Sequence, residues 1–313
     1  MKLEDLIKST LYVGREVEVE DMLQILSNED TSYKFYSDVE CSGGQAQSIY
    51  FVDGKIKHLL YSNTPLQPRV LISQVVVGAV SWKDGEGLEI IEDSVKNEFV
   101  MVVPSFMEFE EDAIYIDGLG KLKALKTDNP DLISSSIKYM ATLEMELSRE
   151  LALKGKGIVV KDGSFTPIFI AKESPTFIEN KGPIGLVKII YNFPTDVSEK
   201  LFSMKIGDLS PLYIKSYSDE NDIVSAFLKI GKNSILRMDA IIQSKNKDII
   251  KKAGKVFCSL ASVIPQLTID INYMRLPEDI PPIQSLEYYL GSYIITPQMA
   301  SYFLHEFISQ ILS

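Results

Sequence analysis

Four Asp-Gly pairs, which begin at Asp53, Asp84, Asp117 and Asp162, are the first candidates for chemistry in this sequence. Asp-Gly is ordinarily turn chemistry, and we assign that role to Asp84. Asp53 and Asp162 differ, because each directly follows an apolar stretch, IYFVD and GIVVKD, that is typical of a buried strand. An acid at the end of such a strand predicts a ligand that faces a cleft. A strand-terminating turn is the alternative for either residue alone, and Asp117 is a weaker candidate after AIYI.

A further acid, Glu144, lies within an amphipathic helix that we expect over residues 131–154. The apolar positions of this segment follow one helix face, and Glu144 falls in that series between Met140 and Leu147. A carboxylate in a buried stripe is costly unless it is paired or binds a metal. The helix leads directly into the strand that ends at Asp162, so Glu144 could reach the same cleft. An ion pair with a lysine is an equal alternative.

The composition also favours carboxylate ligands. The chain has only two histidines, His58 and His305, which excludes a zinc site built on several histidines. Oxygen ligands favour Mn²⁺ or Mg²⁺. Converging carboxylates from Asp53, Glu144 and Asp162 would hold one or two such ions, and two ions about 4 Å apart can promote phosphodiester hydrolysis.

The elements that must position these acids follow an α/β pattern. Strands are expected as a meander before the helix and again after it, at residues 48–53, 72–82, 88–92, 113–116, 157–162, 182–193, 210–218, 225–242 and 267–276. Further helices are expected at residues 4–8, 17–28, 195–206, 245–262 and 296–313. We therefore predict an α/β fold, a ribonuclease-H-like mixed sheet with flanking helices and elaborations. A single domain over 1–313 would have helical segments at 1–45 and 276–313 around a core at 46–275.

Charge and cysteine content limit the partners and the location. The formal net charge is −11, which argues against a non-specific DNA coat. Lys247, Lys251 and Lys255 share one face of the 245–262 helix. We favour the interpretation that this face is solvated over the alternative that it contacts DNA. No apolar run could span a membrane and the N-terminus lacks a signal-peptide core, so we expect a cytoplasmic protein without a membrane partner. Cys41 and Cys258 have no metal-binding spacing and are expected to be reduced, buried thiols.

Several of these segments resemble the NurA nuclease family. The run LEMELSRELALKGKGIVVKDGSF is similar to the family's middle motif, in which a helix-borne Glu precedes an apolar strand ending in Asp-Gly-Ser. GPIGLVKIIYN resembles the next strand, IYFVDG the first motif, and INYMRLPEDIPPIQSLEYY the late strand and proline turn. The resemblance runs from about residue 48 to the end. The first motif departs from the family's Asp-Gly-Ser, because Lys55 follows the glycine.

The resemblance implies a ribonuclease-H-like, manganese-dependent deoxyribonuclease, with Mg²⁺ as the alternative ion. It implies a homodimer that works with the hexameric HerA ATPase in DNA end resection for double-strand-break repair, as a 5′–3′ exonuclease and single-strand endonuclease. Asp53, Glu144 and Asp162 would be its metal ligands. Tyr293 matches the family's late tyrosine. The family's histidine follows eight residues later, where this chain has Ser301, and His305 lies about one helical turn beyond.

Alternatives remain open for these residues and for the function. Tyr293 and His305 could orient a phosphate or water, or they could be a core tyrosine and an ordinary helix histidine. Lys188 could neutralise a DNA phosphate or pair with Glu144. A weakly catalytic or inactive NurA-like subunit that binds and regulates the ATPase is the second function, and Lys55 in place of serine would suit it. A nuclease acting on RNA is the third.

Overall fold

The computed structural model describes residues 3–7, 33–39, 41, 46, 48–62, 69–109, 111–155, 157–165, 177–179, 181–188, 190, 194, 197, 203–216, 221–232, 234–243, 246–268 and 280–312. Its strands are β1 (Lys34–Ser37), β2 (Ser48–Ser62), β3 (Val70–Lys83), β4 (Gly87–Ile90), β5 (Lys96–Pro104), β6 (Ala113–Ile116), β7 (Gly120–Thr127), β8 (Ile158–Asp162), β9 (Ile184–Val187), β10 (Leu212–Ser216), β11 (Asn221–Lys229) and β12 (Ile235–Gln243). Its labelled helices are α2 (Leu132–Lys154), α5 (Lys247–Ala261), α6 (Pro281–Gly291) and α7 (Pro297–Leu312), with 3₁₀ turns at Glu92–Ser94 and Ile264–Leu267.

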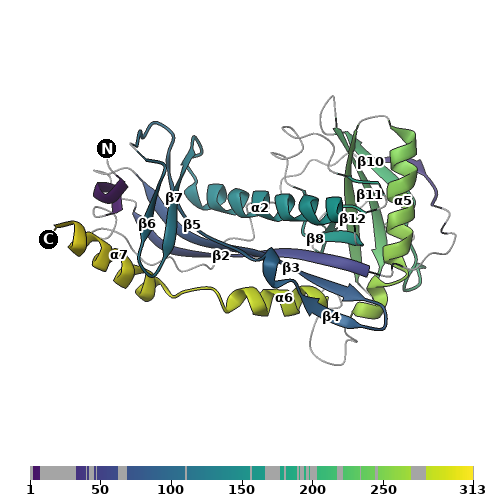
Figure 1. The fold of residues 1–313 in the computed structure, drawn as a ribbon. Coiled ribbons are helices and arrows are strands. Elements are labelled where there is room, and N and C mark those ends of the chain that lie inside the picture. Colours follow the sequence, from purple (N-terminus) through teal and green to yellow (C-terminus); the bar gives the residue numbers. More distant parts are fainter. Residues whose placement is uncertain are drawn as a thin grey trace.

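The described strands form one mixed sheet of twelve (Figure 1). Strands β2, β3 and β5 pair antiparallel as a meander, and β8 then joins β2 in parallel. Strand β9 continues in parallel beside β8, so the central order is β5-β3-β2-β8-β9. Helix α2 makes the crossover between the meander and β8. The predicted fold class, an α/β fold built on a large mixed sheet with flanking helices, is therefore confirmed.

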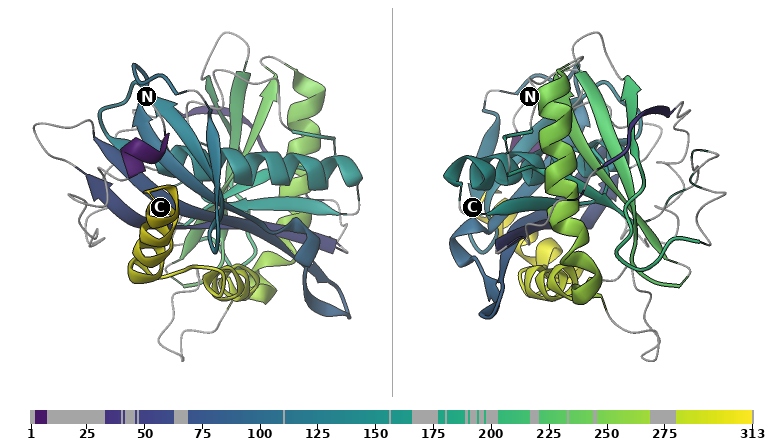
Figure 2. Two further views of the ribbon diagram at one scale, coloured as in Figure 1. Left: turned by 60° about the vertical axis from the view of Figure 1, so that its left-hand side comes forward. Right: turned by 90° about the vertical axis from the view of Figure 1, so that its right-hand side faces the viewer.

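Helices cover both faces of this sheet (Figures 1 and 2). Side chains of β2 alternate between the faces, as the period of a strand requires. Tyr50 and Val52 pack with the buried stripe of α2, whereas Ile49 and Phe51 belong to the core that α5 and α6 cover. A third core lies at the far end of β2, where α7 and residues 3–7 pack against it. None of the described helices is long and apolar enough to span a membrane.

The helix that carries Glu144 begins and ends where the sequence predicts. The Asp131 side chain accepts a hydrogen bond from the backbone N–H of Ser134, which caps the N-terminus of α2. Gly155 ends the helix in a left-handed conformation, with φ of 71°, that glycine adopts without steric cost. Glu144 itself is buried among the helix residues that face the sheet.

The predicted end of the first strand at Asp53 is wrong. β2 continues to Ser62, so Asp53 lies in the middle of a 15-residue strand. Gly54 is not a turn residue here. A Cβ on Gly54 would lie 2.7 Å from Oε1 of Glu144, so the glycine is explained by the close approach of α2.

Other predicted segments differ in their outcome. The proline-containing stretch before the C-terminus, expected as a turn, starts α6, because proline is well placed in the first turn of a helix. The C-terminal helix is confirmed as α7. The expected helix at 17–28 and most of the strand at 267–276 lie outside the described residues, as does most of the helix at 195–206.

The prediction of two free, buried thiols is also wrong, because Cys41 and Cys258 form a disulfide. Their Cα atoms are 5.4 Å apart, within the usual range for a disulfide. The bridge joins the segment after β1 to helix α5. A sequence separation of 217 residues gives no local signal of such contact.

His58 on β2 gives the fold a pH-dependent stability. Its Nδ1 lies 2.9 Å from Oγ of Ser73, and burial, helped by Lys57, lowers its pKa to about 4. The unfolded chain therefore binds a proton near pH 6.5 that the folded protein rejects. We expect this residue to contribute about 3 kcal/mol of stability above pH 6.5, lost as the pH falls towards 4.

The check on His58 is chemical denaturation from pH 4 to 7. His58→Gln should lose less unfolding free energy on acidification than wild type, whereas His305→Gln, at an exposed histidine, should follow wild type. Parallel curves for wild type and His58→Gln would contradict the assignment.

Candidate metal centre

Two of the predicted acids lie side by side in the middle of the sheet. Strands β2 and β8 run parallel with Val52 opposite Lys161, and the next residues on these strands are Asp53 and Asp162. By alternation both acids share the face of Phe51, which α6 covers. Asp53 is buried at 7% exposure, and Asp162 is half-buried.

Helix α6 adds a third carboxylate, Glu287, from above this face. One ligand oxygen from each of Asp53, Asp162 and Glu287 lies within 4.8 Å of the others. Ile283, Leu286 and Leu290 of α6 are fully buried and fix the helix on the sheet, which leaves Glu287 beside the apolar stripe and exposed. Glu287 was not among the residues predicted from the sequence, because its segment was expected to be a turn. An apolar stripe with helical spacing after Pro281 was the available signal.

The electrostatics of this group fit a cation. Burial raises the pKa of Asp53 well above its usual value, and the negative charges of Asp162, Glu144 and Glu287 raise it further, against a hydrogen bond from the backbone of Gly54. Oδ1 of Asp162 is buried and has no hydrogen-bond partner among the described residues. Clustered acids with an unsatisfied inward oxygen are the donor set that Mg²⁺ or Mn²⁺ prefers. Asp53, Asp162 and Glu287 therefore fit a divalent ion.

Lys188 lies at the same group, directly after β9. Its Nζ donates to Oδ2 of Asp162 at 2.9 Å. Burial opposes the charged form of Lys188, but Asp162 and then Asp53 and Glu287 raise its pKa above the usual value. Lys188 thus pairs with Asp162, and not with Glu144, which was one of the two alternatives predicted for it from the sequence.

Glu144 does not belong to the group of three. Helix α2 packs on the opposite face of the sheet, where Oε2 of Glu144 lies 2.7 Å from Nζ of Lys161. Both side chains are buried, and Lys161 also donates to the backbone carbonyl of Asp162 at 2.7 Å. Burial raises the pKa of Glu144 above its usual value, and the charge of Lys161 offsets only part of this rise. The lysine partner that the sequence left open is the one the structure has.

Tyr293 lies close to α6 but outside this group. Its hydroxyl is 3.0 Å from that of Tyr289, and its backbone carbonyl accepts a hydrogen bond from Gln74. Its ring packs partly buried against the core under α6. The described contacts therefore give Tyr293 a packing role.

His305 lies on α7 at the other end of β2. Its neighbour Leu304 packs in the same core as Leu59 and Leu60, and His305 itself is exposed. Six residues of strand separate Asp53 from Leu59, which is about 20 Å. The structure therefore does not bring His305 to the carboxylates.

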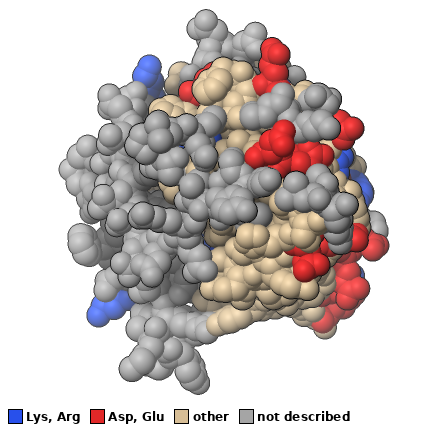
Figure 3. All heavy atoms as spheres, turned by 90° about the vertical axis from the view of Figure 1, so that its left-hand side faces the viewer, with Lys and Arg blue, Asp and Glu red and all other residues tan. Residues whose placement is uncertain are grey.

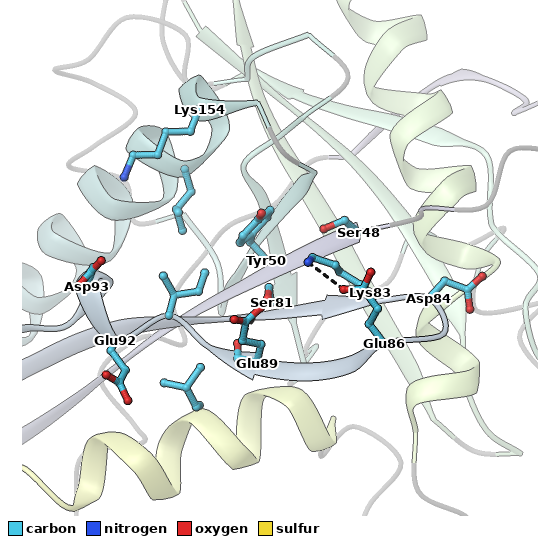
Figure 4. A pocket seen from close by; sticks show the side chains of 13 residues that line it. Ser48, Tyr50, Ser81, Lys83, Asp84, Glu86, Glu89, Glu92, Asp93 and Lys154 are labelled. Carbon is cyan, nitrogen blue, oxygen red and sulfur yellow. Dashed lines mark hydrogen bonds and ion pairs between the residues drawn. The ribbon is translucent and has the colours of Figure 1, made fainter.

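The molecular surface has two further features. A groove of about 1080 Å³ runs beside β3 and β4, and its lining includes Glu86, Glu89 and Glu92 with Lys83 bonded to Glu86 (Figure 4). None of the predicted site residues lines it. On the face at the α7 end, acidic side chains gather along one edge and few Lys or Arg are visible among the described residues (Figure 3). The lysines of the 245–262 segment that the sequence placed on one helix face are exposed on α5.

Comparison with known proteins gives no family. No family model matches the sequence, and no curated protein matches it. Among solved structures, the NurA nuclease from Sulfolobus solfataricus matches with a TM-score of 0.40 and 13% identity, covering 84% of this chain and 88% of that chain. Identity and superposition at this level are too low to assign a family or an activity.

Proposed function

We propose that the chain is a divalent-metal-dependent nuclease that hydrolyses phosphodiester bonds of DNA at the Asp53, Asp162 and Glu287 group. The observation behind this proposal is the convergence of their ligand oxygens within 4.8 Å, on two adjacent parallel strands and one covering helix. The buried, unpartnered Oδ1 of Asp162 supports a cation at this point. All three acids lie in segments that resemble NurA nucleases, and for two of them, Asp53 and Asp162, the resemblance itself implies a metal-binding role.

The roles of the chain's own groups follow from their positions. Asp53, Asp162 and Glu287 would hold the metal, which when bound supplies Lewis-acid stabilisation of the phosphate and a more acidic water. Lys188 holds Asp162 in one orientation and adds a positive charge beside three acids. Glu287 is the exposed member of the group, so the site opens to substrate on its side.

The finer proposal follows the sequence resemblance. The ion is Mn²⁺ or Mg²⁺, the substrate is single-stranded DNA or a duplex end, and the cleavage is 5′–3′ exonucleolytic with single-strand endonuclease activity. A homodimer would act with a HerA-type ATPase in the cytoplasm. A net charge of −11 makes delivery of DNA by such a partner reasonable, because the chain as a whole repels the phosphates of DNA.

The test is cleavage of 5′-labelled and 3′-labelled single-stranded and duplex DNA, with and without Mn²⁺ and the ATPase. We expect wild type to cut only with the metal, and Asp162→Asn to lose about 10³-fold in rate, the several kcal/mol that metal stabilisation supplies. Asp117→Asn is the matched control, because Asp117 also precedes a glycine but is exposed in a turn.

Both outcomes are informative. Equal activity of wild type and Asp162→Asn would place the chemistry elsewhere. A folded wild type that cuts no DNA with or without the ATPase would overturn the nuclease and favour the non-catalytic subunit.

A further inference from the structure

Lys55 lies beside the candidate metal centre and is not one of the residues that would hold the metal. It follows Asp53 by two residues on β2, so its side chain leaves the same face of the sheet about 6–7 Å further along the strand. The side chain is exposed. This is the position at which the first motif departs from Asp-Gly-Ser.

Helix α6 fixes where the amine of Lys55 lies. Its Nζ is 3.3 Å from the point that a Cβ on Gly291 would occupy, so the glycine leaves room for the amine. Gly291 follows Glu287 by four residues, which places the two on one side of the helix about 6 Å apart. The amine therefore lies roughly one helical turn from the carboxylate group.

The three lysines around the centre differ in their partners. Lys161 is bonded to Glu144, and Lys188 is bonded to Asp162. Lys55 forms no ion pair with any of the described residues. An exposed amine without a carboxylate partner, one helical turn from a metal-binding group, is suited to an anion that extends beyond the metal.

We propose that Lys55 binds the phosphate next to the one held at the carboxylates, and so forms a subsite for an extended nucleic-acid strand. The distance of roughly 6 Å is one that a single nucleotide of an extended strand can span, since the rise is about 3.4 Å even in a stacked duplex. This inference rests on the proposed function and adds to it a substrate class, a strand with a neighbouring phosphate rather than a lone nucleotide.

Binding of a fluorescent phosphorothioate oligothymidylate, which resists hydrolysis, to the protein with Mn²⁺ tests the subsite while the carboxylate group is intact. Lys55→Ala should weaken binding about fivefold at about 0.1 M salt and lower the slope of log affinity against log salt by about 0.7, the value for one lost contact to a single strand. Lys55→Arg should restore both. Lys121→Ala, at an exposed lysine on β7, should change neither.

A competition experiment tests the neighbouring position itself. Thymidine 3′,5′-bisphosphate should displace the oligonucleotide better than thymidine 5′-monophosphate, and Lys55→Ala should remove most of that preference. If Lys55 only packs against the end of α6, Lys55→Ala should lower the melting temperature and leave the salt slope and the preference for the bisphosphate unchanged. That result would overturn the inference. DNA cleavage by wild type tests the nuclease separately, so the two proposals fail by different measurements.

Discussion

Asp53→Asn is expected to stabilise the metal-free protein and to remove both its response to Mn²⁺ and its cleavage of DNA. Asp53 is buried, and Asp162, Glu144 and Glu287 all disfavour its charge. Asparagine keeps the shape and removes that charge, so the metal-free fold loses a repulsion. The same change removes a ligand, and we expect cleavage to fall by about 10³-fold.

Thermal unfolding with and without Mn²⁺ measures both the gain in metal-free stability and the loss of metal binding. A metal that binds only the folded state at 100 times its Kd stabilises it by about 2.7 kcal/mol, so the melting temperature of wild type should rise with Mn²⁺. Asp53→Asn should start higher in EDTA and change little with the metal, whereas Asp117→Asn should behave as wild type. A wild type that melts at the same temperature in EDTA and in excess Mn²⁺ and Mg²⁺ would show that these acids do not form a metal site.

The pH dependence of the same experiment has a defined sign. Because the pKa of Asp53 is raised in the folded protein, protonation of Asp53 favours folding of the metal-free protein. This stabilisation is complete below the ordinary pKa of 3.8 and is lost as the pH rises through the raised pKa of the folded state. His58 acts in the opposite direction, since its stability is lost on acidification. The difference between wild type and Asp53→Asn isolates the first effect.

Local signals were sufficient for much of this fold. The first two strands of the meander, the crossover helix and the strand that ends at Asp162 follow from apolar runs and helical periodicity within their own segments. Strands β5 and β7 were not predicted. The ends of α2 follow from Asp131 and Gly155, which satisfy the helix termini by contacts within four residues. Asp53 and Asp162 could be paired as candidates for the same reason, since each follows an apolar run in the sequence.

Contacts between distant segments were beyond the same reasoning. Glu287 reaches the site only because α6 lies over β2, more than 220 residues earlier in the chain. The face on which Glu144 lies depends on the side of the sheet that α2 covers, and the sequence does not state it. The role of Gly54 also depends on a distant segment, because this glycine allows helix α2 to approach the strand and does not form the turn that Asp-Gly usually indicates. Cys41 and Cys258 likewise meet only through the packing of α5.

The position of Glu144 leads to the second large prediction, on the buried pair with Lys161. Lys161→Met should destabilise the protein by about 3–5 kcal/mol, because it leaves the carboxylate of Glu144 buried without a partner. Glu144→Leu should destabilise the protein by a similar amount, because it leaves the ammonium group of Lys161 buried without its carboxylate partner. The double variant should recover most of the loss, since two apolar side chains can replace a buried pair at little net cost. Urea denaturation of the four proteins gives the coupling free energy.

The double variant also separates the two roles that the sequence left open for Glu144. If Glu144 only pairs with Lys161, the Glu144→Leu and Lys161→Met protein should still be stabilised by Mn²⁺ and still cleave DNA. If Glu144 binds the metal, both properties should be lost although the fold is restored. We expect the first result, because Glu144 lies across the sheet from Glu287 and its carboxylate is held 2.7 Å from an ammonium group. Some loss of rate is expected even then, since Lys161 also holds the backbone carbonyl of Asp162 and so positions a metal ligand.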